Sequence, residues 1–186
     1  MQSYDYSSRQ GIHPIGWMDF HAMARRLAEE LALHQPDAII GIARAGLIPA
    51  AEVAYMLRTE LYPIRLTRRQ NDQVVYPQPV WVTPVPEDVA GKVIAVVDEI
   101  ASRGETLAMA ADAVRAQGAQ RVITACLVSH SWANPQPDLT VLVSDALVIF
   151  PWGRHIWLNG RWQPHPEYVS ALESQGLDAS ALEQNL

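Results

Sequence analysis

Residues 92–107 of this 186-residue chain read KVIAVVDEIASRGETL, and this stretch decides the fold. Five apolar residues, 93–97, run directly into two acids, Asp98 and Glu99. A short apolar run rich in β-branched residues that ends in polar residues is typical of a buried parallel strand. The run therefore predicts a central strand over residues 92–97, with both carboxylates at its exit and outside the core.

The residues that follow the acids form a small polar loop before a helical pattern begins. This loop consists of Ala101, Ser102, Arg103, Gly104, Glu105 and Thr106. In open α/β sheets, ligands bind beyond the carboxyl ends of the strands, and a loop entering a helix can present N–H groups to a phosphate. Carboxylates do not bind phosphate, but they can accept hydrogen bonds from sugar hydroxyls or lie near Mg²⁺. The predicted ligand is a sugar phosphate with vicinal hydroxyls.

Strand and helix patterns alternate along the chain, which predicts an α/β fold with a parallel sheet. Further strands are expected at residues 38–43, 61–66, 80–82, 122–128, 139–143 and 146–150. Helices are expected at residues 18–34, at residues 46–57, from Leu107 onward and, weakly, from Pro166. Residues 157–162 contain Asn159-Gly160, which fits the type I′ turn of a β-hairpin.

Length and composition predict one domain, residues 1–186, with a sizeable core. The net charge of −6 argues against a nucleic-acid partner. The single cysteine, Cys126, lies in an apolar run and is expected to be a buried thiol. No apolar run approaches the about 20 residues of a membrane span, and no signal-peptide pattern opens the chain. We therefore expect a cytoplasmic protein without a membrane partner.

The stretch at residues 92–107 resembles the phosphoribosyl pyrophosphate (PRPP) motif of the type I phosphoribosyltransferases. The family pattern is a hydrophobic strand, two acids, an apolar pair, a variable residue, a small hydroxyl residue, Gly, any residue and Thr. The positions that fit are Asp98, Glu99, Ile100, Gly104 and Thr106. Arg103 stands where the family usually has Thr, and Ser102 stands where 6-oxopurine members carry Asp. The resemblance extends from about Trp17 to Trp152 and implies a parallel sheet flanked by helices, with a small C-terminal hood.

The resemblance implies that, in the presence of Mg²⁺, PRPP reacts with a nucleobase to give a nucleoside monophosphate and pyrophosphate. Asp98, Glu99 and Arg44 would then be the catalytic residues, and the two acids would also lie at the metal. Residues 101–106 would bind the 5′-phosphate of PRPP. Family members are commonly dimers or tetramers, so a homo-oligomer is expected.

A second strand-to-helix turn, IIGIARAGLIP at residues 39–49, resembles the pyrophosphate loop of xanthine-guanine-type members. It places Arg44, Ala45 and Gly46 at pyrophosphate, because an Arg fork suits phosphate oxygens and small residues allow close approach. In the family this loop can hold a non-proline cis peptide. The family also has a mobile loop that closes over PRPP, which corresponds here to about residues 67–79 and would bring Arg68 and Arg69 to the pyrophosphate.

The C-terminal third resembles the base site of purine-type members, xanthine-guanine and hypoxanthine enzymes among them. The matching stretches are residues 129–132, 137–138 and 144–152, and the hood and base site would cover about residues 129–165. The base-binding residues implied are His130, Leu147, Val148 and Trp152. His130 replaces a Lys that donates to the purine 6-oxygen, and Leu147 replaces an aromatic residue that stacks on the base.

Two functions remain open at this point. The first is a phosphoribosyltransferase that transfers the 5-phosphoribosyl group from PRPP to a nucleobase, a purine or an unusual base. Arg44 and the basic loop at residues 67–79 favour this catalytic function. The second is a non-catalytic regulator of the same fold that binds PRPP or a nucleotide. Both need the acid pair and the phosphate loop. Ser102 cannot act as a general base near neutral pH, because an unactivated hydroxyl does not accept a proton.

Overall fold

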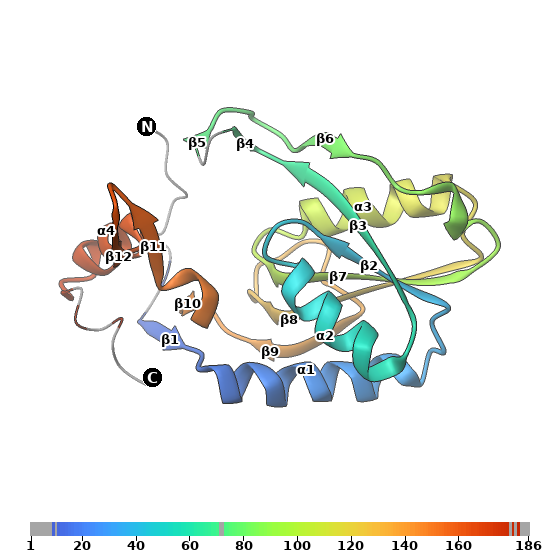
Figure 1. The fold of residues 1–186 in the computed structure, drawn as a ribbon, viewed down its shortest axis with the longest axis horizontal. Helices are drawn as coiled ribbons and strands as arrows, with labels where there is room; N and C mark the ends of the chain where they lie inside the picture. Colours follow the sequence, from blue (N-terminus) through green and yellow to red (C-terminus); the bar gives the residue numbers. More distant parts are fainter. Residues whose placement is uncertain (1–8, 10, 71–72, 179, 181, 183–186) are drawn as a thin grey trace. The chain divides into compact units, whose positions relative to one another are not determined.

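The structure is a computed structural model that describes residues 9, 11–70, 73–178, 180 and 182. Its contacts divide the chain into two compact units, residues 23–143 and residues 1–22 with 144–186. Figure 1 shows the helices and strands of both units. The single-domain organisation stays a prediction.

The larger unit contains a six-stranded sheet with the order β6-β3-β2-β7-β8-β9. Its strands are β2 (Ala38–Ile42), β3 (Glu60–Thr67), β6 (Val80–Thr83), β7 (Val93–Ala101), β8 (Arg121–Ser129) and β9 (Leu139–Val143). All neighbouring pairs are parallel except β3 and β6, which are antiparallel. The predicted strand at residues 93–97 is confirmed as a central strand, because β7 lies between β2 and β8.

Strand β7 is longer than the sequence predicts. It continues past the two acids to Ala101, because β8 runs alongside it and the ladder pairs Asp98 with Cys126 and Ala101 with Ser129. Asp98 is only 9% exposed. The prediction that both carboxylates lie at the exit of the strand and outside the core is therefore wrong for Asp98.

Helices cover both faces of this sheet (Figure 1). Side chains alternate between the faces of a strand. The core on one face contains Ala38, Ile40 and Ile42 of β2 together with residues of α3 (Glu105–Ala116). Gly41 between them faces Leu47 and Ala50 of α2 (Leu47–Leu57). Helices α2 and α3 therefore lie on opposite faces, as in the α/β arrangement that the sequence predicts.

Two further segments of this unit bear on the function. Helix α1 (Trp17–Ala32) forms where the helical pattern predicts it, and its residues 23–32 belong to the larger unit. Within residues 67–79, strands β4 (Arg69–Gln70) and β5 (Gln73–Val74) pair as an antiparallel hairpin, so this segment has the hairpin character expected of it. A short 3₁₀ turn, η1 (Glu87–Val89), precedes β7.

The smaller unit contains two short sheets and a helix. Strand β1 (Ile12–Pro14) pairs in parallel with β10 (Leu147–Ile149), and β11 (His155–Leu158) pairs with β12 (Arg161–Pro164) as an antiparallel hairpin. The turn η2 (Pro151–Gly153) and helix α4 (Pro166–Ser174) complete it. Asn159 and Gly160 have φ values of 54° and 75°, which confirms the predicted hairpin turn.

Leu147 and Ile149 pack with Ala171, Leu172 and Leu182 in the core of the smaller unit. The strand expected at residues 146–150 is present as β10, and it pairs with β1 instead of a strand of the six-stranded sheet. Among the described residues, none of the helices is both long enough and apolar enough to cross a bilayer.

Candidate active site

The acid pair lies at the carboxyl end of the central strand. Asp98 is buried, and its Oδ1 accepts a 3.0 Å hydrogen bond from the backbone N–H of Glu99, which is half-buried. Burial raises the pKa of Asp98 well above its ordinary value, and the negative charge of Glu99 raises it further. Glu99 is therefore the more accessible carboxylate of the pair, while the Asp98 carboxyl is held in place.

The turn after β2 lies against the acid pair. It begins with a cis peptide bond between Ala43 and Arg44, and the Arg44 side chain is exposed. The N–H of Leu47 donates to the Arg44 carbonyl at 3.2 Å, which leads the chain into α2. Gly46 is buried, and a Cβ built on it would overlap Asp98 Oδ1. The structure thus brings the predicted pyrophosphate loop into contact with Asp98.

The predicted phosphate loop is shorter than the sequence suggests. Only Ser102, Arg103 and Gly104 separate β7 from α3, because Glu105 and Thr106 already belong to the first turn of the helix. Gly104 is the N-cap with φ +84°, a left-handed conformation that favours glycine. The first backbone N–H groups of a helix have no intrahelical partner, so this end of α3 can bind an anion.

The turn after β8 is tied to the phosphate loop. The N–H of His130 donates to the Ala101 carbonyl at 3.2 Å, and that of Asn134 donates to the Arg103 carbonyl at 2.9 Å. A Cβ on Gly104 would overlap the Pro135 carbonyl oxygen, so the glycine also permits this close approach. The peptide bond between Asn134 and Pro135 is cis. The phosphate loop and the turn therefore form one packed region.

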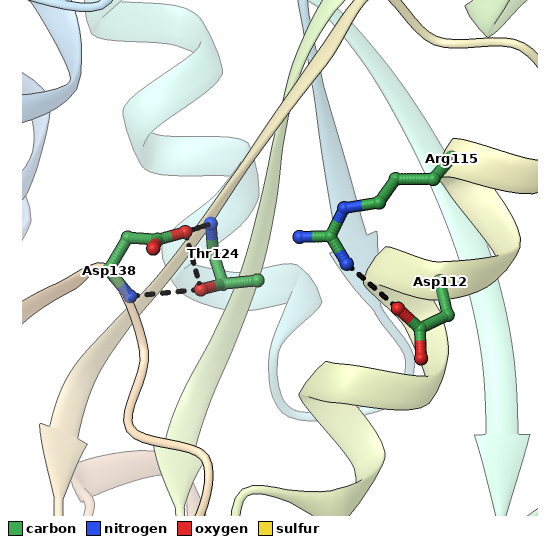
Figure 2. Close-up of polar contacts among 4 residues, drawn as sticks. All are labelled: Asp112, Arg115, Thr124 and Asp138. Atoms are coloured by element: carbon green, nitrogen blue, oxygen red, sulfur yellow. Dashed lines mark hydrogen bonds and ion pairs between the residues drawn. The ribbon is translucent and has the colours of Figure 1, made fainter.

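Asp138 anchors the far end of this turn to β8 (Figure 2). Its Oδ2 accepts 2.8 Å hydrogen bonds from both the backbone N–H and the hydroxyl of Thr124. In return, the N–H of Asp138 donates to Thr124 Oγ1 at 2.9 Å. The Pro-Asp pair of the predicted base site therefore includes a residue that fixes the turn to the sheet.

The predicted base-binding residues come from both units. His130, in the larger unit, is 1% exposed, and its ring stacks on Trp132 with centroids 4.7 Å apart and planes 15° apart. In the smaller unit, the side chains of Leu147 and Val148 are 2% and 6% exposed, and Trp152 stacks on Phe150 at 4.7 Å. The assignment of these residues to a base stays a prediction.

Trp132 lies in the stretch predicted to form the base site, but it is not among the base-binding residues that the resemblance implies. It is 41% exposed although it stacks on the buried His130 ring. Its neighbourhood is fixed, because Gln136 Nε2 donates to the carbonyl oxygens of His130 and Ser131 at 2.9 and 3.2 Å. The signal was its position two residues after His130 in a stretch that resembles the base site.

The loop that carries Arg68 and Arg69 is hydrogen-bonded within itself. Arg68 Nε donates to the Tyr76 carbonyl at 3.1 Å, and the backbone N–H of Arg69 donates to Thr67 Oγ1 at 3.0 Å. Both arginines are half-buried. Their contact with pyrophosphate stays a prediction, as does the mobility of the loop.

A small apolar cluster consists of Ala101 of β7, Cys126 of β8 and Ala133 of the turn. Cys126 is fully buried, and its Sγ lies 3.0 Å from the Val128 carbonyl oxygen and 3.5 Å from Thr140 Oγ1. Burial raises the pKa of this thiol to about 12. The expected buried core thiol is confirmed, and it lies beside the start of the phosphate loop.

An acid pair at the carboxyl end of a central parallel strand, followed by a short loop and a glycine-capped helix, defines a class of α/β protein whose candidate ligand site lies at the carboxyl edge of the sheet. Within this class, the chain belongs to the phosphoribosyl transferase domain family, whose model matches residues 16–155. The resemblance in the sequence is thereby confirmed.

Three solved structures share the fold. A purine phosphoribosyltransferase from Pyrococcus horikoshii Ot3 is 30% identical with a TM-score of 0.69, and the match covers 76% of this chain and 93% of that one. A hypothetical protein from Neisseria gonorrhoeae with bound ppGpp is 24% identical with a TM-score of 0.63, covering 75% and 89%. The xanthine-guanine-hypoxanthine phosphoribosyltransferase of Helicobacter pylori is 17% identical with a TM-score of 0.60, covering 76% and 92%. Comparison with curated proteins gives no significant match.

Proposed function

We propose that this protein transfers the 5-phosphoribosyl group from PRPP to a purine nucleobase, giving a nucleoside monophosphate and pyrophosphate. The observation that carries the proposal is the contact of Gly46, in the predicted pyrophosphate loop, with Asp98 of the predicted PRPP motif. PRPP carries a pyrophosphate group on a ribose. The contact places the loop predicted to bind the pyrophosphate beside an acid predicted to bind the ribose. Membership of the phosphoribosyl transferase domain family and 30% identity to a purine enzyme support the reaction class.

The residues present can perform this reaction as follows. A ring nitrogen of the base attacks C1 of the ribose, the C1–O bond breaks, and pyrophosphate leaves with the bonding electrons, while the N–H proton of the base passes to solvent. Positive charge develops on the sugar, where Asp98 and Glu99 accept hydrogen bonds from the ribose hydroxyls. Arg44 and the N–H groups of its turn stabilise the leaving pyrophosphate. The end of α3 holds the 5′-phosphate and fixes the position of the sugar.

The donor set fits a Mg²⁺ ion that arrives with the substrate. Asp98 and Glu99 are adjacent carboxylates, and the described part of the chain holds no group of three or more potential ligands. Mg²⁺ is commonly bound through one or two carboxylates together with substrate phosphates, rather than by an all-protein cage. When bound, it would withdraw negative charge from the pyrophosphate oxygens.

On the base side we propose His130 with its partner Trp132, together with Leu147, Val148 and Trp152. A neutral histidine still has one N–H to donate to a carbonyl group of the base, but it is a weaker donor than a lysine ammonium. Leu147 supplies no aromatic face, and its side chain is buried in the smaller unit. We therefore expect weaker selection among 6-oxopurines than an enzyme with Lys and an aromatic residue at these positions would show.

The alternative is a non-catalytic regulator of the same fold that binds PRPP or a nucleotide. Its support is the set of departures at Ser102, His130 and Leu147. The Neisseria gonorrhoeae protein was solved with bound ppGpp. Its similarity to this chain shows a shared fold and does not show that this chain binds the same ligand. Both functions need the acid pair, so mutation of the acids does not separate them.

A substrate panel separates the two functions. The protein is incubated with Mg-PRPP and, in turn, hypoxanthine, guanine, xanthine, adenine and several pyrimidines, and released pyrophosphate is measured. We expect base-dependent pyrophosphate with at least one purine, and kcat/KM values across the panel then rank the bases. Tight binding of Mg-PRPP with no pyrophosphate for any base would contradict the transferase and favour the regulator.

We further propose a cytoplasmic homo-oligomer, a dimer or a tetramer, on the family resemblance alone. Sedimentation equilibrium over a range of protein concentrations tests the oligomer. A monomer at every concentration would contradict it. The proposal of PRPP and a nucleobase as partners rests on the same resemblance. The proposal of no nucleic-acid partner rests on the net charge of −6, and that of no membrane partner rests on the lack of an apolar run of about 20 residues.

A further inference from the structure

The backbone conformation at residue 46 does not require a glycine. It is the N-cap of α2 with φ −63° and ψ −17°, a right-handed helical conformation that any residue adopts. What the position lacks is space for a side chain. A Cβ built there would lie 2.6 Å from the Ile42 carbonyl oxygen and 3.0 Å from Asp98 Cα, and it would overlap Asp98 Oδ1.

The carboxylate cannot easily move out of the way. Asp98 Oδ1, the atom that faces Gly46, also accepts the hydrogen bond from the Glu99 N–H at 3.0 Å. The residue is only 9% exposed, so little solvent-filled space is open to its side chain. A side chain at residue 46 would therefore displace either the Asp98 carboxyl or the start of α2.

We propose that Gly46 is a positioning residue that holds Asp98 and the pyrophosphate loop in one fixed arrangement. Because Gly46 has no side chain, the loop after β2 can pack directly against the Asp98 carboxyl on β7. The ribose-binding acid and the pyrophosphate-binding turn are then set relative to each other before ligand arrives. This inference deepens the proposed function and rests on it, because it concerns how the two parts of one PRPP site are aligned.

The first test is a double-mutant cycle on stability, which requires no substrate. The variants are Gly46→Ala, Asp98→Ala and the double mutant, and the readout is the urea midpoint of unfolding. We expect Gly46→Ala to lower the midpoint less in the D98A background than in the wild type, because the carboxylate it collides with is gone. Contacting residues show such non-additivity, whereas independent residues do not.

Gly41→Ala is the matched control. A Cβ at Gly41 would lie 2.7 Å from Ala50 Cβ and 2.8 Å from Leu47 Cδ2, so it also crowds α2, and its nearest atoms belong to α2 instead of Asp98. Its effect on the midpoint should be the same with and without D98A. Equal shifts for Gly46→Ala in both backgrounds would overturn the proposal. If G46A does not fold, a folded G46A/D98A double mutant supports the proposal, and an unfolded one overturns it.

The second test measures turnover per folded molecule. Displacement of a catalytic group by about 1 Å can cost roughly 100-fold in rate, so G46A should lower kcat by that order. The KM for the nucleobase should not change, because the base site is untouched. A kcat that falls only in proportion to the folded fraction would overturn the positioning role. A wild-type protein that neither binds Mg-PRPP nor releases pyrophosphate would instead refute the proposed function, whatever the cycle shows.

Discussion

The N–H of Asn134 donates a 2.9 Å hydrogen bond to the carbonyl oxygen of Arg103, which joins the turn after β8 to the phosphate loop. His130 and Trp132 lie in that turn, and Arg103 lies between the acid pair and α3. A phosphate bound at α3 would order the phosphate loop and, through this bond, the turn. If the proposed phosphate site is correct, we expect its occupation to affect the position of the proposed base-side residues through this bond.

The acid pair is essential to the proposed reaction. Asp98→Asn with Glu99→Gln should abolish measurable turnover, a loss of at least roughly 100-fold, because the charge that balances the developing cation is removed. The fold should survive, since the asparagine oxygen can still accept the Glu99 N–H bond. Initial rates of pyrophosphate release and circular dichroism spectra check the two parts.

Asp112→Asn is the control for this double mutant. Asp112 is an exposed carboxylate on α3 that pairs with Arg115 at 2.8 Å (Figure 2), far less buried than Asp98. Its replacement should leave the rate unchanged. A double mutant with the wild-type rate would remove the catalytic role of the acids.

Stability should fall with rising pH because of Asp98. Burial raises its folded-state pKa above the ordinary value of 3.8, so the folded state binds more protons than the unfolded state between these two pKa values. The contribution is fully present below pH 3.8 and is lost as pH rises through the folded-state pKa. Asp98→Asn removes this dependence, so the variant should gain in free energy of unfolding relative to wild type as pH rises toward neutrality.

Urea unfolding of wild type and Asp98→Asn, measured in steps from pH 3.8 to neutrality, provides the check. Asp112→Asn, measured in parallel, should show no such pH-dependent gain. A constant difference between wild type and Asp98→Asn across the range would show that the Asp98 carboxyl is not desolvated in solution.

The Thr124–Asp138 contact should stabilise the turn after β8. Thr124→Val keeps the shape of the side chain and removes the hydroxyl that bonds Asp138 twice. We expect a loss of about 1 kcal/mol in free energy of unfolding. The KM for the nucleobase should rise, while the affinity for Mg-PRPP changes little. Urea unfolding and initial-rate kinetics measure these effects.

Thr140→Val is the matched variant on β9. Its hydroxyl lies 3.5 Å from Cys126 Sγ, a weaker partner than a carboxylate. It should cost less stability than Thr124→Val and leave the KM for the base unchanged. Equal effects of the two substitutions would contradict a special role for Asp138.

The segment at residues 67–79 should be protected by ligand. Trypsin can cleave after Arg68 and Arg69, and addition of Mg-PRPP should slow this cleavage if the segment closes over the substrate. Cleavage after Arg161, which is exposed near the turn of the β11–β12 hairpin, serves as an internal control and should keep its rate. Gel densitometry with mass spectrometry of the fragments gives both rates. Equal rates at Arg68 and Arg69 with and without ligand would remove the lid hypothesis.

The sequence predicts most elements because local signals are strong. The apolar run at residues 93–97 marks the central strand, and Asn159-Gly160 marks the hairpin turn. It does not predict how far β7 extends. The polar pair Asp98 and Glu99 resembles a strand exit, but the partner strand β8 continues the ladder to Ser129. Strand length is set here by a neighbour that is distant in sequence.

Contacts between residues distant in the sequence also explain the other differences between the predicted and the observed structure. The pairing of β1 with β10 joins two three-residue strands that are far apart in the sequence. A strand is expected at residues 146–150, but no pattern in the sequence specifies its partner. Within the site, the acids, Arg44 and the phosphate loop follow from the motifs. The contact of Gly46 with Asp98 and the stacking of Trp132 on His130 depend on three-dimensional packing, which no spacing in the sequence specifies.

The lone thiol at Cys126 gives the protein a native chemical reporter. Only the thiolate reacts with alkylating reagents, and a buried thiol with a pKa of about 12 scarcely ionises at neutral pH. Labelling must therefore wait for a fluctuation that separates β8 from the elements around it. Cys126 pairs with Asp98 across the β7–β8 ladder. The alkylation rate would therefore report how often the carboxyl end of the sheet, where the acids lie, opens locally. The effect of a ligand on local opening near the acids can thus be measured with the native thiol, without introducing another cysteine.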